Sequence, residues 1–234
     1  MHIAFLDANT ERAAFDERHG SEMQKFRTLL EPVAPGWRYS DFPVTEGAFP
    51  AALAEFDGVM ISGSPASVND TAPWVAQLMD TIRAAVSAEI PVFGACFGHQ
   101  AVAKALGGTV GDNPQGWVLG RVETVNHSPA PWMEGAGPAM ALHAAHKEQV
   151  TALPRGARVL AGTDSVPHGH LALGTRVFTT QYHPEITPAF MAELVDLIAP
   201  ELAPEAEQAV RAALPGPLDD TQMAAWIARF FRQG

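Results

Sequence analysis

The only cysteine of this 234-residue chain, Cys96, stands between two glycines in the run GACFG (94–98). The apolar run PVFGA (91–95) leads into it and is typical of a strand buried on both faces of a sheet. A helix is predicted to follow from about residue 98 to 106, ended by two glycines. A strand, a tight G-x-C-x-G turn and a helix make up a nucleophile elbow. The pattern therefore predicts that Cys96 is a nucleophile.

The predicted turn would favour a reactive sulfur. It would present the Cys96 side chain at the carboxyl edge of the sheet, where α/β folds bind ligands. Unpaired N–H groups at the start of the following helix favour a negatively charged sulfur, and the N–H of Phe97 would lie near an oxyanion formed on the attacked carbon. The flanking glycines would relieve crowding at a strained residue. The alternative is a buried cysteine packed as a small apolar side chain, so a partner base is needed to decide.

His183 is the best candidate for that base. It follows the apolar run RVFTTQY (176–182) and precedes Pro184 and Glu185. A second parallel strand ending beside the first would bring His183 to Cys96, and the Glu185 carboxylate would orient the imidazole. This is the logic of a catalytic triad.

Four further histidines occur as two close pairs. Carboxylate or cysteine ligands to complete a metal site beside either pair are not evident, so no metal is predicted. Core or surface positions are the simplest interpretation, and a role at the rim of a substrate site stays open. The four are His143, His146, His168 and His170.

Short apolar runs alternate with helical patterns, which predicts an α/β fold with an open, mostly parallel, twisted sheet flanked by helices. An added antiparallel segment is predicted in the middle, and helices near the C-terminus. The predicted strands are 2–6, 37–42, 57–62 and 91–95, then 121–125, 139–143, 157–162, 170–174 and 176–182. The predicted helices are 21–31, 73–88, 98–106, 187–198 (with Thr187 as N-cap), 204–213 and 220–231.

The runs GACFGHQ (94–100) and QYHPE (181–185) together resemble the class I, triad-type glutamine amidotransferases, including the glutaminase domain of GMP synthetase. The resemblance covers roughly residues 1–195. It implies a flavodoxin-like catalytic domain over 1–198, with 199–234 as a helical extension packed on the same domain. No second domain with a synthase activity is apparent.

The resemblance also implies roles for single residues. GVMISGSPASV (58–68) looks like the family's oxyanion loop, with a backbone donor from Ser64 preceded by Gly63. GWVLG, with Gly116 and Trp117, looks like the segment that touches the amino-acid end of the substrate, and Gln100 would line the glutamine pocket. The chain departs from the family at AAHKEQV (144–150), where many members carry Ser-His-x-Asp, which puts selectivity or partner docking at that rim in question.

The implied reaction is hydrolysis of the side-chain amide of glutamine or a γ-glutamyl compound through a thioester on Cys96, without a cofactor. Three interpretations remain. The chain is a glutamine amidotransferase that delivers ammonia to a synthase subunit, an independent γ-glutamyl hydrolase or peptidase, or a catalytically silent binding or regulatory protein. The presence of Cys96, His183 and Glu185 together argues against the catalytically silent protein.

The bulk composition excludes other classes of partner. The formal net charge is −11 and no cluster of Lys and Arg interrupts it, so nucleic acid is not an expected partner. No uncharged apolar stretch of about 18 residues or more occurs, so no membrane span is expected. The N-terminal run lacks the basic start of a signal peptide. A single cysteine cannot form an internal disulfide, which agrees with a cytoplasmic location.

Overall fold

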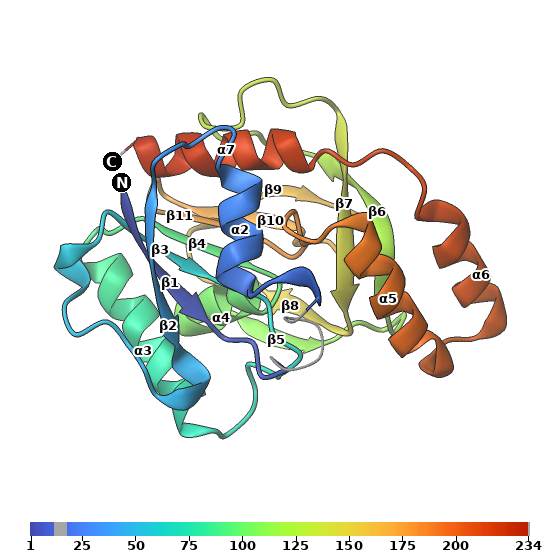
Figure 1. Ribbon diagram of the computed structural model, residues 1–234, viewed down its shortest axis with the longest axis horizontal. Helices are drawn as coiled ribbons and strands as arrows, with labels where there is room; N and C mark the ends of the chain where they lie inside the picture. The colour runs from blue at the N-terminus through green and yellow to red at the C-terminus, as the bar shows by residue number, and fades with distance from the viewer. Residues whose placement is uncertain (12–17, 234) are drawn as a thin grey trace.

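A computed structural model describes residues 1–11 and 18–233 of the chain. Residues 12–17, in the predicted catalytic domain, and Gly234, in the predicted extension, lie outside the described residues. Within the described part, nine strands form one mixed sheet in the order β2-β1-β3-β4-β11-β10-β9-β6-β7 (Figure 1). The first five run parallel, and the remaining pairings are antiparallel. The α/β class with an antiparallel addition is therefore confirmed.

The antiparallel strands extend the parallel half directly, because β10 pairs with β11. The parallel half holds β1 (His2–Asp7), β2 (Arg38–Pro43), β3 (Gly58–Ile61), β4 (Val92–Ala95) and β11 (Val177–Thr180). The antiparallel half holds β6 (Val118–Asn126), β7 (Ala139–His146), β9 (Ala157–Gly162) and β10 (His170–Leu173).

Two strands were missed by the sequence-based prediction. They are β5 (Thr109–Asp112) and β8 (Glu148–Ala152), which pair with each other in a separate two-stranded sheet. Neither run alternates cleanly between apolar and polar residues, and β5 contains Gly111, which weakens a strand. Their pairing joins segments that are distant in sequence, so local patterns could not reveal it.

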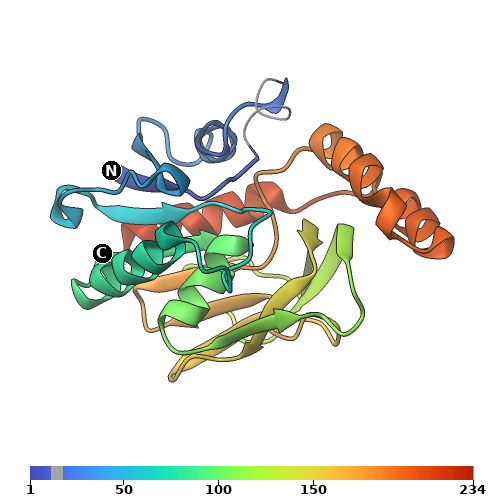
Figure 2. The same ribbon diagram turned by 90° about the horizontal axis from the view of Figure 1, so that it is seen from below.

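Helices cover both faces of the parallel half. One face packs against α2 (Glu22–Leu30) and α7 (Asp220–Arg232), and the other against α3 (Pro73–Ser87) and α4 (Phe97–Ala105). In Figure 2 the green α3 and α4 lie below β1 and β3, and the blue α2 lies above these two strands. None of the helices within residues 1–11 and 18–233 combines the length and hydropathy of a transmembrane span.

A helical pair stands beside the antiparallel half (Figure 1). It consists of α5 (Pro188–Ile198) and α6 (Pro204–Ala213), joined by the short 3-10 helix η3 (Ala199–Glu201). The hydroxyl of Thr187 accepts the N–H of Phe190 at 3.2 Å, so Thr187 is the N-cap of α5 as predicted. Two more 3-10 helices, η1 (Val44–Glu46) and η2 (Leu53–Glu55), connect β2 to β3.

The aromatic residues of α7 lie inside the main core. Phe230 stacks at 5.2 Å from Trp132 and at 5.8 Å from Phe178 of β11, measured between ring centroids. Phe231 lies so close to Gly58 of β3 that an added Cβ there would fall 2.4 Å from its ring. The last helix thus packs on the same core as the strands that lead to Cys96.

Replacing Phe230 with alanine should lower the free energy of unfolding by about 3–5 kcal/mol, because a fully buried aromatic ring leaves a cavity. Urea denaturation followed by circular dichroism measures the change. The matched control is Val125→Ala, at a side chain that is 47% exposed, with an expected effect within about 0.5 kcal/mol. Equal small effects would contradict a shared core.

Candidate active site

Cys96 occupies a strained turn at the end of β4. Its backbone has φ 48° and ψ −103°, and Glu89 is the other non-glycine residue with positive φ among those described. A Cβ added at Gly94 would lie 2.5 Å from the backbone of Gly98, and one added at Gly98 would lie 2.5 Å from the carbonyl oxygen of Ile61. The two glycines therefore allow α4 to cross directly over β3 and β4. The strain is held by this packing and points the thiol out of the sheet edge.

His183 reaches the same edge from β11. The parallel pairing of β11 with β4 sets Thr180 beside Ala95, and the Cys96 N–H donates to the Thr180 carbonyl at 2.9 Å. The His183 N–H donates to the carbonyl of His143 on β7 at 2.8 Å. Two strand ends thus bring the thiol and the imidazole together, and β7 fixes the position of the histidine.

Glu185 orients the imidazole. Its Oε1 accepts a hydrogen bond from Nδ1 of His183 at 2.6 Å, and the Glu185 side chain is fully buried. Burial alone would lower the pKa of His183, but the charges of Cys96 and Glu185, together with hydrogen bonds to both, raise that pKa well above its ordinary value. The raised pKa favours the protonated form of the His183 imidazole.

The loop after β3 closes the other side of the thiol. The Ser62 hydroxyl accepts the N–H of Ala8 at 2.8 Å and donates to the Gly63 carbonyl at 2.9 Å. Because the carbonyl and N–H of a trans peptide point in opposite directions, this bond turns the N–H of Ser64 away from Ser62. The N–H of Phe97 lies in the first turn of α4, where no intrahelical acceptor exists. Among the described residues neither N–H donates a hydrogen bond, so both can serve a ligand.

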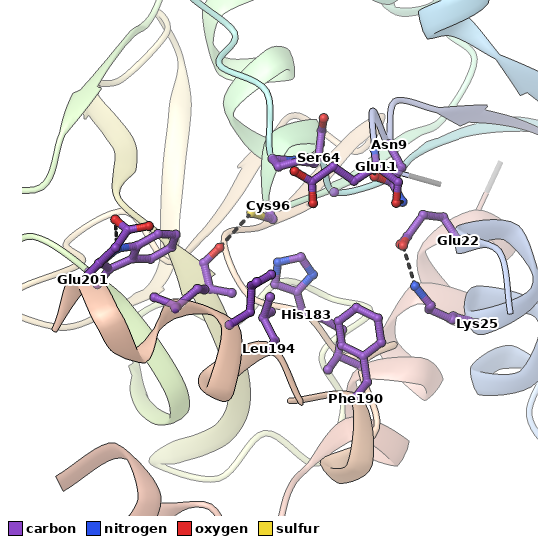
Figure 3. Close-up of a pocket in the computed structure, with 17 residues that line it drawn as sticks. Asn9, Glu11, Glu22, Lys25, Ser64, Cys96, His183, Phe190, Leu194 and Glu201 are labelled. Atoms are coloured by element: carbon purple, nitrogen blue, oxygen red, sulfur yellow. Dashed lines mark hydrogen bonds and ion pairs between the residues drawn. The ribbon is translucent and has the colours of Figure 1, made fainter. Parts of the chain in front are cut away.

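A cavity of about 500 Å³ opens above the thiol (Figure 3). Its walls are polar toward β1, α2 and the loop after β3, and apolar toward α5. The lining residues are Asn9, Glu11, Glu22, Lys25, Gly63, Ser64, Pro65, Cys96, Trp117, Ala145, His183, Ile186, Phe190, Leu194, Leu197, Ile198 and Glu201.

Two of the predicted substrate-binding residues do not line this cavity. Gln100 is buried, and its amide donates to the Glu148 carbonyl at 2.8 Å and to Gln181 at 3.3 Å. Its side chain bonds β8 to α4, and its contact with a substrate stays a prediction. Gly116 also lies off the cavity, in a turn at φ 80°. Trp117 does line it, with its indole N–H donating to Glu201 Oε2 at 3.1 Å.

Three of the unassigned histidines are each held by one backbone hydrogen bond. Their Nδ1 atoms bond backbone carbonyls: His143 to Ile186 at 2.9 Å, His146 to Glu148 at 2.9 Å and His168 to Val150 at 2.8 Å. Burial lowers the pKa of His146 to about 4 and that of His170 to about 3, so both are neutral. Within residues 1–11 and 18–233, no group of His, Cys, Asp or Glu is arranged to hold a metal ion.

Sequence reasoning missed Glu22 and Lys25 of α2. They form an ion pair at 2.6 Å inside the cavity, with side chains only 10% and 6% exposed. Charged residues three apart at a helix start usually indicate a solvent-facing surface, so the sequence carried no signal of their burial.

Comparison with known proteins identifies the fold and the family. The family model described as "Glutamine amidotransferase class-I" matches residues 36–194, more than half of the chain. The chain belongs to the class-I glutamine amidotransferases. This confirms the predicted class of activity, hydrolysis of the side-chain amide of glutamine or a γ-glutamyl compound.

Individual relatives include enzymes of two kinds. The chain is 27% identical to gamma-glutamyl peptidase 3 of Arabidopsis thaliana over 77% of its own length and 78% of that protein. It is 34% identical to the glutamine-hydrolyzing GMP synthase of Streptomyces coelicolor, over 55% of its own length and 24% of that protein. In fold it is similar to a glutamine amidotransferase from Thermotoga maritima, with a TM-score of 0.78, 15% identity, and coverage of 100% of this chain and 97% of that one.

Replacing Glu185 with glutamine should move the basic limb of the kcat/KM pH profile to lower pH. The substitution removes one of the negative charges that raise the pKa of His183, so the imidazolium loses its proton at lower pH. Hydrolysis rates across the pH range measure the shift. Asp80→Asn, at an exposed carboxylate on α3, is the control and should leave the limb in place. An unmoved limb in Glu185→Gln would contradict this account.

Replacing Gly63 with alanine should lower kcat/KM by about a hundredfold, because the new Cβ would lie 2.8 Å from Cε1 of His183 and displace the ring. Steady-state kinetics gives the change, and Gly137→Ala, in open exposed chain, is the matched control. Wild-type kinetics in Gly63→Ala would show that the ring tolerates the displacement.

Proposed function

We propose that Cys96 is the nucleophile of a γ-glutamyl amide hydrolase, with His183 as general acid and base and Glu185 as its orienter. The observation that carries this proposal is the strained cysteine beside an imidazole whose Nδ1 is bonded to Glu185 at 2.6 Å. The pKa of His183, raised well above its ordinary value, supports a thiolate–imidazolium pair, since each charge stabilises the other.

In the first half of the reaction, the sulfur of Cys96 bonds to the amide carbon of the substrate. The oxyanion that forms is stabilised by the N–H groups of Phe97 and Ser64, each contributing about 3 kcal/mol to the transition state. The carbon–nitrogen bond then breaks, and the nitrogen takes the imidazolium proton of His183 as it leaves. A γ-glutamyl thioester on Cys96 remains.

In the second half, water attacks the thioester and gives its proton to His183. The carbon–sulfur bond breaks, glutamate leaves, and the Cys96 thiolate is restored beside the imidazolium. The same oxyanion donors and the same base serve both halves. Glu185 keeps one tautomer of the ring throughout, so Nε2 is the atom that exchanges protons.

The cavity supports a leaving group larger than ammonia. Its volume of about 500 Å³ falls in the range of about 300–1,000 Å³ that holds drug-sized ligands, which exceeds the needs of free glutamine. Relatives named gamma-glutamyl peptidases support the same choice. The competing proposal is an amidotransferase that hydrolyses glutamine for a synthase partner. Assays of the chain alone against glutamine and γ-glutamyl dipeptides separate the two: dipeptide turnover without a partner supports the hydrolase.

Replacing Cys96 with alanine should lower glutamate release by about 10⁶-fold, the cost of removing the nucleophile from a triad. Glutamate is measured enzymatically. A chloroketone analogue of glutamine should add once to the wild-type chain by mass spectrometry and not at all to the variant, since Cys96 is the only cysteine. Wild-type glutamate release from Cys96→Ala would sink the proposal.

A further inference from the structure

The buried ion pair of α2 is unusual in its position. Lys25 Nζ donates to Glu22 Oε1 at 2.6 Å, and both side chains are almost wholly removed from solvent. Removing two charges from water costs more free energy than an ion pair on the surface contributes. Apolar side chains at these positions would often stabilise the fold better. Phe26 and Leu30 already pack α2 against the core. The pair therefore calls for a role other than stability.

The pair lies at one end of the catalytic cavity. Figure 3 shows His183 in the middle, with Glu201 on one side and the Glu22–Lys25 pair on the other. Lys25 Nζ sits 4.3 Å from the ring centroid of Phe190, which holds the ammonium in place. A substrate bound across Cys96 has room in both directions. One end would lie near Glu201, and the other would lie near the Glu22–Lys25 pair.

The Glu22–Lys25 end of the cavity offers hydrogen-bond donors to an anion. Burial, despite the nearby Lys25, raises the pKa of Glu22 to about 7, because the buried site disfavours the charged carboxylate. The ammonium of Lys25 has three N–H donors, of which Glu22 takes one. A ligand carboxylate would supply an acceptor for the remaining N–H donors of Lys25.

We infer that the Glu22–Lys25 end of the cavity is the leaving-group subsite, and that it selects γ-glutamyl compounds whose leaving amine carries a carboxylate. Such a leaving group is an amino acid or a peptide. The inference rests on the proposed function. The resemblance assigns the glutamyl end to the Trp117 segment, which leaves the opposite end for the group beyond the scissile amide.

The walls of this subsite fit the same kind of leaving group. Phe190 and Leu194 offer an apolar surface beside the ion pair for an aliphatic side chain. The chain as a whole carries a formal charge of −11, which disfavours an anionic substrate at long range. A single cation inside the cavity would offset that repulsion at the position of the substrate carboxylate. Lys25 would therefore act as a specificity-determining residue.

The test compares two substrates that differ only in a carboxylate: γ-glutamyl-leucine and γ-glutamyl-3-methylbutylamide. The ratio of their kcat/KM values cancels general damage to the fold or to the catalytic groups. In Lys25→Met, which keeps the apolar stem, the ratio should fall by about tenfold to a hundredfold, the value of a charge-assisted hydrogen bond.

The matched control is Lys147→Met. Lys147 also packs over an aromatic ring, 4.9 Å from the centroid of Trp117, and also pairs with a carboxylate, that of Glu201. Its partners Trp117 and Glu201 line the other end of the cavity, so the Lys147→Met variant should keep the wild-type ratio. A second variant, Glu22→Gln, keeps the ammonium and should retain or raise the preference for the dipeptide.

Two results would overturn the inference. An unchanged ratio in Lys25→Met would show that no carboxylate is recognised there. An equal fall on both substrates and on glutamine would place the glutamyl end, and not the leaving group, at Lys25.

Binding to the Cys96→Ala protein separates this inference from the proposed function. Calorimetry of the Cys96→Ala protein should give γ-glutamyl-leucine a lower Kd than γ-glutamyl-3-methylbutylamide. Adding Lys25→Met should remove that difference. If the wild-type chain releases no glutamate from any substrate, the proposed function fails, while these Kd values still decide the subsite. Equal Kd values for both compounds in Cys96→Ala would overturn it.

Discussion

The close crossing of α4 over the ends of β3 and β4 is the constraint on which the site depends. Gly94 and Gly98 have no side chains, so the helix backbone approaches the strands to distances that any Cβ would block. This contact forces Cys96 into its positive-φ turn and directs the start of α4 at the sulfur. The strain is therefore stored in packing and does not depend on the thiol itself.

Everything else at the site is positioned relative to that crossing. The parallel partnership of β4 and β11 brings the histidine to the cysteine, and β7 anchors the histidine from the antiparallel half of the sheet. The loop after β3 supplies the facing peptide groups, held by the Ser62 hydroxyl. The site thus joins both halves of the sheet, and α5 adds the apolar wall that turns an open edge into a cavity.

Much of this arrangement could be predicted from the sequence, because it follows from local rules. Strand ends with a cysteine and a histidine, a proline-stiffened carboxylate and helix caps are all visible in short runs. Burial that depends on distant segments was not visible. Gln100 bonds β8, which forms only by pairing with β5, and the Glu22–Lys25 pair is covered by elements far along the chain. For these residues the deciding neighbours are non-local.

The position of α7 has a consequence for how the chain folds during synthesis. Phe231 packs on Gly58, and Phe230 covers Phe178, so the last helix completes the face of a sheet whose first strand is His2–Asp7. The part of that face that lies under α7 cannot be covered until residues 220–232 have left the ribosome. Synthesis at about 5–20 residues per second then leaves apolar strands exposed for several seconds. Over that interval the nascent chain presents a surface suited to chaperone binding.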